Sequence, residues 1–229
     1  MTNAVMTPVT LYRSTIGKKV VMAVTGMMLW GYVVFHMLGN LKIFTGAFHF
    51  DEYAEFIRRV GDPLLGHQWF LWGVRVVLLA AVILHIVAAT QLSLRNTNAR
   101  ARDYTKTEIV NANYASRTMR WGGVIILLFI IYHVLHLTTG TLHPDFRQGE
   151  VYYNVVAGFK VWYVSVAYIV AVIAMGAHLY HGTWSMLQTI GGNRPGLDPY
   201  IRRFSKALGV GVTIGYALVP LGVLAGIIH

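Results

Sequence analysis

The chain has 229 residues, of which 55% are hydrophobic and only 12% are charged. Soluble domains carry about 25% charged residues, so this composition excludes an ordinary soluble domain and predicts a membrane protein. The net charge of +10 is confined to particular loops, and we therefore expect no nucleic-acid partner. The absence of cysteine from the sequence excludes disulfides and thiolate ligands supplied by this chain.

Five apolar segments are long enough to cross a bilayer, which needs roughly 20 helical residues. The first segment is too long for a cleavable signal peptide, and no small-residue cleavage site follows it. The sequence therefore predicts an all-α membrane protein, a single-domain bundle of five transmembrane helices. The expected spans lie near residues 18–41, 69–94, 121–141, 158–190 and 206–228.

The connection between the first two spans, residues 42–68, is the longest on its side of the membrane. Within it, DEYAEFIRRV has apolar residues at helical spacing, and Gly61 and Pro63 follow. We expect a short surface helix that begins near Asp51 and ends before Gly61. Aromatic residues gather near the predicted span ends, as in the belts at membrane–water interfaces. They are Trp69, Trp72, Trp121, Tyr152, Tyr153, Trp162 and Tyr163.

Basic residues are unevenly divided between the two sets of alternating loops. The N-terminal segment and the 95–120 and 194–206 loops hold 13 Lys and Arg, whereas the other side holds five, together with six acids. The positive-inside rule then places the N-terminus in the cytoplasm and the C-terminus outside. The basic face would meet lipid headgroups or a docked soluble partner. Its residues are Arg13, Lys18, Lys19, Arg95, Arg100, Arg102, Lys106, Arg117, Arg120, Arg194, Arg202, Arg203 and Lys206.

Each of the first four spans carries a histidine deep in its apolar run, where an unpaired polar group costs several kcal/mol. At 1.5 Å per residue, His85 and His178 lie roughly 15 and 18 Å from the basic ends of their spans. On the same scale His36 lies roughly 27 Å from that side, and His133 and His136 roughly 20 and 24 Å. The histidines therefore fall into two layers.

Two imidazoles at equal height on facing helices fit the axial ligation of a b-type haem, whose iron takes two nitrogens trans to each other. One such histidine alone would more often be bonded to a carbonyl, but four in two matched layers favour ligation. The spacing leaves a choice within two close pairs, His133 with His136 and His178 with His181, whose other member would support the ligand or a propionate. Arg75 would offset a propionate charge or extend to the interface.

Several stretches resemble the cytochrome b membrane subunit of succinate dehydrogenases and fumarate reductases, in its one-chain, five-helix, di-haem branch. STIGKKVVMAVTGMMLWGYVVFHMLGNL (14–41) resembles the first helix of that subunit, with HMLGN at its ligand-bearing end. RVVLLAAVILHIVAA (75–89) is similar to its second helix and LLFIIYHVLHLTTG (127–140) to its third. AHLYHGTWSMLQTIG (177–191) resembles its fourth, in which the ligand begins a His-x-x-x-Gly-x-aromatic pattern.

The resemblance implies two b haems and a particular set of iron ligands. On the pattern of the fourth helix it selects His178 over His181, and on the third helix it selects His133 over His136. The expected pairs are His85 with His178 in the layer nearer the cytoplasm and His36 with His133 in the outer layer.

The resemblance also implies partners and a location. The family's subunit anchors a flavoprotein and an iron–sulfur subunit to the cytoplasmic face of a bacterial cytoplasmic membrane, in complexes that can form higher oligomers. Electrons from succinate would pass through FAD and iron–sulfur clusters to the haems and on to a quinone, with menaquinone expected. This chain has no flavin or nucleotide motif, so succinate chemistry would belong to its partners.

A quinone site needs hydrogen-bond donors close to a haem edge and to an interface. Ser14 and Lys18 are candidates on the cytoplasmic side. Glu52, Glu55 and Trp69 are candidates on the outer side, where the acids could accept protons.

Three other interpretations stay open at this point. A histidine pair on the cytoplasmic side, with cysteines donated by a partner chain, could hold a Rieske-type cluster. A histidine-lined proton or metal transporter would need carboxylates near the midplane, and the five predicted spans contain none. A purely structural anchor, with haems that only fill the bundle, is the third.

Overall fold

The computed structural model describes residues 8–98, 110–192, 194 and 196–229, and these form helices and turns without a β-strand. Arg100, Arg102 and Lys106 of the basic face lie outside the described residues. The elements in chain order are α1 (Pro8–Arg13), α2 (Thr15–Leu41), the 3-10 helix η1 (Lys42–Thr45), α3 (Ala47–Arg59), α4 (Trp69–Asn98), α5 (Val110–His133), the π-helix η2 (Val134–Thr138), α6 (Val151–Lys160), α7 (Trp162–Thr189) and α8 (Asp198–Leu224).

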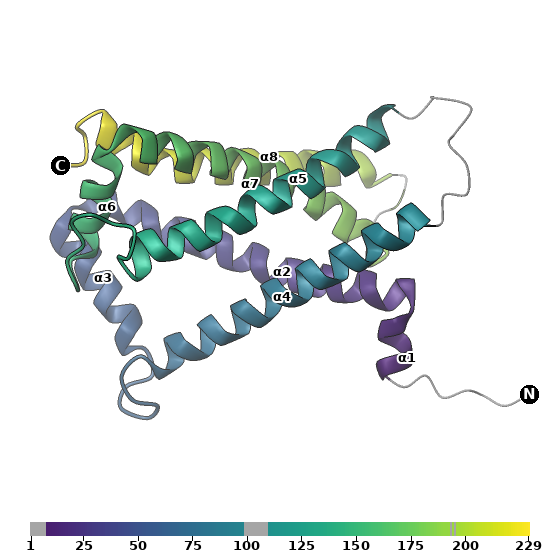
Figure 1. The fold of residues 1–229 in the computed structure, drawn as a ribbon, viewed down its shortest axis with the longest axis horizontal. Coiled ribbons are helices and arrows are strands. Elements are labelled where there is room, and N and C mark those ends of the chain that lie inside the picture. Colours follow the sequence, from purple (N-terminus) through teal and green to yellow (C-terminus); the bar gives the residue numbers. More distant parts are fainter. Residues whose placement is uncertain (1–7, 99–109, 193, 195) are drawn as a thin grey trace, which may run out of the picture.

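Five helical segments are long and apolar enough to cross a membrane, which confirms the predicted all-α bundle of five spans. They run back and forth along the long axis of the molecule (Figure 1). The end that carries α1 and the start of α5 is called the α1 end below. The opposite end, with α3, α6 and the C-terminus, is called the α3 end. The segments are Thr15–Thr45, Trp69–Asn98, Met119–Thr138, Trp162–Thr189 and Asp198–Leu224.

The fourth span starts later than the apolar run suggests. The run from 158 to 190 is interrupted at Val161, which has an extended backbone (φ −78°, ψ 103°) and separates α6 from α7. Across this break the hydroxyl of Ser165 donates to the carbonyl of Phe159 at 2.6 Å. A carbonyl outside a regular helix is thus satisfied inside the protein, as buried backbone groups must be.

Other boundaries differ because hydropathy and helix formation are separate properties. The surface helix α3 begins at Ala47, before the expected start at Asp51, and it ends at Arg59 as the following Gly61 predicted. The third span ends at Thr138. The fifth helix begins at Asp198, because its polar first turns continue an α-helix that the apolar run alone does not mark.

The spans pack unevenly. α7 and α8 lie closest together, since a Cβ atom on Gly176 would come within 2.6 Å of the carbonyl oxygen of Gly209. α8 is also fastened to α2, where the hydroxyl of Tyr216 donates to the carbonyl of Val33 at 2.8 Å. α4 packs mainly on α2. In Figure 1, α4 diverges from α2 toward the α3 end.

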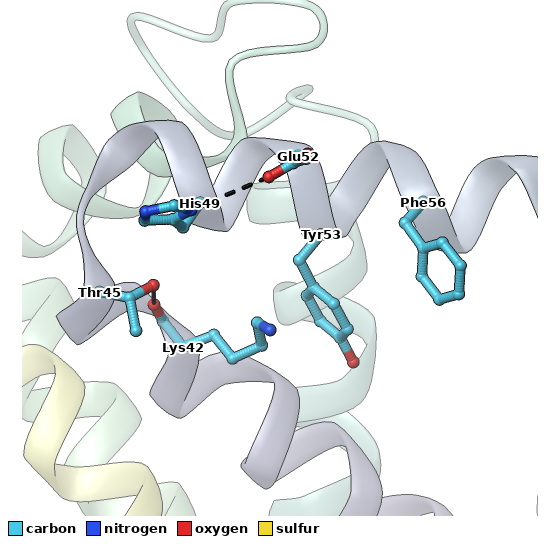
Figure 2. A pocket seen from close by; sticks show the side chains of 6 residues that line it. All are labelled: Lys42, Thr45, His49, Glu52, Tyr53 and Phe56. Atoms are coloured by element: carbon cyan, nitrogen blue, oxygen red, sulfur yellow. Dashed lines mark hydrogen bonds and ion pairs between the residues drawn. The ribbon is translucent and has the colours of Figure 1, made fainter.

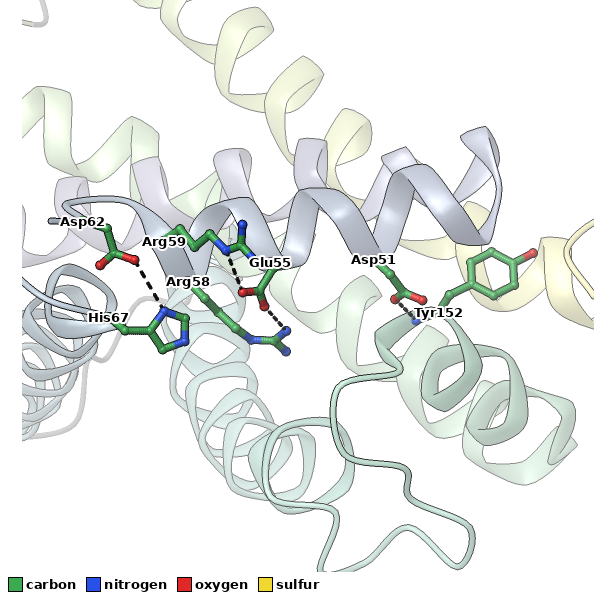
Figure 3. Close-up of polar contacts among 7 residues, drawn as sticks. All are labelled: Asp51, Glu55, Arg58, Arg59, Asp62, His67 and Tyr152. Atoms are coloured by element: carbon green, nitrogen blue, oxygen red, sulfur yellow. Dashed lines mark hydrogen bonds and ion pairs between the residues drawn. The ribbon is translucent and has the colours of Figure 1, made fainter.

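A buried apolar cluster lies at the α3 end, beneath α3 and α6. The carboxylate of Asp51 on α3 accepts a hydrogen bond from the backbone amide of Tyr152 at 2.8 Å (Figure 3), which caps the first turn of α6. The cluster closes this end of the bundle. Its members are Ile43, Phe50, Val156, Phe159, Val164, Tyr168, Val219, Val223 and Ile228.

Candidate functional site

Two of the predicted site histidines meet in the half of the bundle nearer the α1 end. His85 on α4 and His178 on α7 face each other, with ring centroids 6.3 Å apart and planes inclined by 62°. The two helices are not close neighbours, because α4 packs mainly on α2. The side chains therefore reach toward each other across the interior of the bundle.

The other two predicted histidines meet nearer the α3 end. His36 on α2 and His133, the last residue of α5, have ring centroids 5.9 Å apart and planes at 83°. The ring of Tyr32 stacks on His36 at 5.2 Å, and that of Tyr216 lies 6.2 Å away. The structure thus brings together both pairs that the sequence suggested.

The separation within each pair suits one metal centre between two imidazoles. A metal–nitrogen bond of about 2 Å on each side, with about 1.1 Å from nitrogen to ring centre, puts trans imidazole centroids about 6.2 Å apart. Among the described residues, no three His, Cys, Asp or Glu side chains gather into a metal-binding cluster. Two protein ligands per site fit a cofactor that supplies the remaining nitrogens itself, as a haem macrocycle does.

Hydrogen bonding prepares the ring of His85 for ligation. Its Nδ1 lies 3.2 Å from the hydroxyl oxygen of Thr25 on α2. The Thr25 hydroxyl donates its own proton to the carbonyl of Val21 at 2.7 Å. Its oxygen therefore accepts from Nδ1–H, and the lone pair of the His85 ring stands on Nε2. This is the tautomer that a metal ligand needs.

Small residues and an unpaired nitrogen surround the same pair. A Cβ atom on Gly26 would lie 3.3 Å from Cε1 of His85, and one on Gly123 would lie 3.9 Å from Cε1 of His178. Nδ1 of His178 is buried without a hydrogen-bond partner in the part of the chain that the structure describes. A buried polar atom without a partner calls for an explanation, and a bound group is one of them. These features fit a flat cofactor held between the two rings.

His133 is held differently, by a tyrosine. The hydroxyl of Tyr168 on α7 lies 3.4 Å from Nδ1 of His133 and 3.0 Å from Nδ1 of His136. Tyr168 is only 5% exposed, so its hydroxyl has no competing solvent. One phenolic oxygen therefore links the two histidines between which the sequence spacing left a choice.

Within the described residues, the ring contacts of His136 are with Tyr132, His143 and Tyr168 and not with His36 or His133. His136 is 1% exposed and stacks between the rings of Tyr132, at 5.4 Å, and His143, at 4.9 Å. α6 approaches it at Gly158, where a Cβ atom would lie 2.7 Å from Cε1 of His136. The residue lies in the π-helix η2, a widened turn that often occurs at functional sites.

The two remaining residues of the predicted haem environment, His181 and Arg75, have ring contacts of their own. His181 is half-buried and packs against Tyr180, with ring centroids 4.7 Å apart. Arg75 is exposed on α4, and its guanidinium lies over the ring of Trp72 at 4.9 Å. Of the two readings of Arg75, this position matches an arginine packed on an interfacial tryptophan.

The predicted quinone residues at the α1 end already have structural partners. The hydroxyl of Ser14 caps α2 by accepting from the amide of Gly17 at 2.9 Å. The ammonium group of Lys18 donates to the side-chain oxygen of Gln91 at 2.6 Å and lies 4.3 Å from the ring centre of Tyr12. These contacts fasten α1 and α2 to α4.

Glu52 lines a surface hollow of about 550 Å³ between η1 and α3 (Figure 2). Its carboxylate faces Nδ1 of His49 at 3.8 Å. On the other wall the ammonium group of Lys42 lies 4.7 Å from the ring centre of Tyr53. The lining is completed by Thr45 and Phe56, so hydrogen-bonding groups and one apolar ring surround the hollow.

Glu55 and Trp69 lie outside this hollow. The carboxylate of Glu55 accepts from Arg59 at 3.0 Å and from Arg58 at 3.3 Å (Figure 3). These hydrogen bonds, Arg59 first, lower the pKa of Glu55 and make it a poorer proton acceptor. Trp69 is 69% exposed at the start of α4, as expected of an interfacial tryptophan.

Three residues of the site were not among the sequence predictions. Thr25 and Tyr168 orient two of the histidines, and His143 is buried, with Nε2 bonded to the carbonyl of Asn154 at 2.9 Å. Thr25 could have been noticed as a polar residue inside the apolar run of the first span. Tyr168 carries no such signal, because a tyrosine in an apolar run resembles any other aromatic residue of a span.

Comparison of the chain with models of protein families, with curated proteins and with solved structures finds no match. The class of protein therefore follows from the fold and the site: an all-α bundle of five membrane-spanning helices whose interior holds two facing histidine pairs.

Proposed function

We propose that this chain is the membrane-anchor cytochrome b subunit of a succinate:quinone oxidoreductase, which carries electrons from an iron–sulfur subunit through two b haems to a quinone. The observation that carries the proposal is the geometry of the two histidine pairs, whose centroid separations of 6.3 and 5.9 Å would let both imidazoles of a pair hold one haem iron. The resemblance to that subunit, which covers most of residues 12–191, supports the choice among haem proteins.

The residues that would hold the cofactors are His85 with His178 and His36 with His133. A bound haem supplies one-electron chemistry at its iron, with a potential tuned by hydrogen bonds to its ligands. Thr25 holds the proton of His85 on Nδ1 and so leaves Nε2 for the metal. All four imidazoles are half-buried, on spans that are long and apolar enough to cross a membrane.

The orientation belongs to the same proposal. The α1 end carries the larger share of Lys and Arg, so it would face the cytoplasm of a bacterial cell and receive the flavoprotein and iron–sulfur subunits, which bring FAD and the clusters. The C-terminus, at the α3 end, would then lie outside. A transporter would need carboxylates in the spans, and the described spans contain only Asp198, the first residue of α8, paired with Arg202 at 2.6 Å.

The hollow beside α3 is the best-supported quinone site. It begins six residues beyond His36 along the chain, roughly 9 Å at the rise of a helix. Lys42 and Tyr53 would bond the ring carbonyls of menaquinone or another quinone, and Glu52 would exchange protons with solvent. Glu55 is less suited, because two arginines hold its carboxylate ionised.

The decisive experiment is the spectrum of the purified chain, dithionite-reduced minus oxidised, with haem quantified per chain. Two six-coordinate, low-spin b haems per chain are expected. A chain that binds none would overturn the proposal, and acid-labile sulfide together with a single haem would replace one pair by a Rieske-type cluster. In the assembled complex, Glu52→Gln should lower succinate-to-quinone turnover severalfold without affecting succinate oxidation by a soluble dye, with Glu55→Gln as the matched control.

A further inference from the structure

Tyr168 stands in the middle of a buried hydrogen-bonded chain. Its hydroxyl lies between Nδ1 of His133 and Nδ1 of His136, at 3.4 and 3.0 Å. Its ring is clamped edge-on by Phe129 and Phe159, with centroids 4.9 and 4.8 Å away. The phenol is therefore fixed in place, and its oxygen faces both imidazoles.

The direction of each hydrogen bond follows from what a metal ligand requires. Ligation through Nε2 leaves the proton of His133 on Nδ1, and this N–H donates to the oxygen of Tyr168. The proton of the Tyr168 hydroxyl then goes to Nδ1 of His136, which accepts it over the shorter distance. A hydroxyl that donates becomes a better acceptor, so the second bond strengthens the first.

We propose that Tyr168 is a positioning residue that fixes the tautomer of His133 and lowers the reduction potential of the haem bound at the His36–His133 pair. The inference rests on the function proposed above. A ligand whose N–H is hydrogen-bonded donates more electron density, which stabilises the oxidised iron. His136 acts in turn through Tyr168, which explains why a buried histidine lies one turn from a ligand without facing the other member of the pair.

The chain offers a matched control in Tyr216. Its ring also lies beside the pair, 6.2 Å from His36, but its hydroxyl donates to the backbone carbonyl of Val33. Tyr216→Phe removes the same oxygen from the same neighbourhood without touching an imidazole.

The test is a redox titration of both haems in Tyr168→Phe and Tyr216→Phe, with low-spin electron paramagnetic resonance of each. In Tyr168→Phe we expect the ratio of reduced to oxidised haem at the His36–His133 pair to rise three- to tenfold at a fixed potential. This equals an upward shift of about 30–60 mV, since tenfold is about 59 mV for one electron. The haem at His85–His178 should keep its potential in both variants.

A second variant separates a tuning role from simple packing. His136→Gln should raise the same potential by a smaller amount, and it should add nothing in the Tyr168→Phe background, because His136 acts through the phenol. If Tyr168→Phe fails to retain the haem, the potential of the His136→Gln variant decides. An unchanged potential in that variant overturns the inference. Equal shifts at both haems, or an equal shift in Tyr216→Phe, also overturn it.

The same measurements distinguish this inference from the proposed function. A wild-type chain without haem would refute the function itself. Two haems with normal spectra, whose potentials Tyr168→Phe leaves unchanged, would refute only the role of Tyr168.

Discussion

The two histidine pairs are alike in spacing but differ in what surrounds them. The His85–His178 pair lies among small residues, and the hydroxyl of Thr25 on a neighbouring span orients His85. The His36–His133 pair lies among aromatic rings and is held by the phenol of Tyr168. Equal separations can thus be built from close backbone approach in one place and from packed rings in the other. We expect the first pair to be sensitive to added volume and the second to lost hydrogen bonds.

The largest expected effect comes from removing one ligand of either pair. His85→Ala should abolish the haem at His85–His178 and keep the other, whereas His133→Ala should do the reverse, because each iron loses a nitrogen that no neighbour replaces. Haem content per chain and the optical spectra of both variants measure this. His181→Ala serves as the control and should retain both haems. The pairing is wrong if His85→Ala and His133→Ala lose the same haem.

The next largest effect should come from a larger side chain beside one pair, which should weaken haem binding at that pair alone. A side chain at Gly26 starts with a Cβ atom 3.3 Å from the ring of His85, so Gly26→Val would displace the ring. Overpacking costs about 1–3 kcal/mol, which corresponds to a loss of haem affinity of about fivefold or more. Haem titration should show the loss at His85–His178 alone. Gly211→Val on α8, where a Cβ atom meets nothing within 4 Å, should bind both haems normally.

The smallest effect concerns the hydroxyl of Thr25. Thr25→Val keeps the shape of the side chain but removes the acceptor for Nδ1–H of His85, which weakens the ligand as an electron donor. The potential of the haem at His85–His178 should rise by about 30 mV, a threefold change in the ratio of reduced to oxidised haem. Thr213→Val, whose hydroxyl bonds only backbone carbonyls on α7 and α8, should leave both potentials unchanged. A shift at the other haem would contradict the assignment of Thr25 to His85.

The heights of the histidines within the bundle could be derived from the sequence. The rotation of each helix about its own axis could not. Hydropathy locates a span, and the rise per residue then gives each histidine its height, which is why His36 was matched to the layer of His133 and His136. The choice of His133 over His136 came from the family resemblance and not from height. In a membrane both the lipid-facing and the interior faces are apolar, so the pattern says little about which side chains meet. The network of Tyr168 and His136 depends on such rotations, and on a π-helix that no simple period marks.

Breaks in the helices were missed for a related reason. The apolar run from 158 to 190 contains no proline at the point where α6 ends, and Val161 is a residue that helices accept. The break depends on Ser165 and on the approach of Gly158 to His136, contacts that exist only in the folded protein. Local propensity is a weak guide where tertiary contacts of this kind decide the backbone.

The cap at the α3 end joins segments far apart in the chain through backbone amides. Asp51 receives the amide of Tyr152, and the side chain of Asn154 both accepts from the amide of Arg147 and donates to its carbonyl, at 2.8 and 2.7 Å. These amides lie near the surface, yet the amide of Tyr152 cannot exchange its proton with water until its bond to Asp51, 101 residues earlier, opens, and the amide of Arg147 cannot until its bond to Asn154 opens. In hydrogen exchange, α3, α6 and the connection before α6 should therefore open as one cooperative unit.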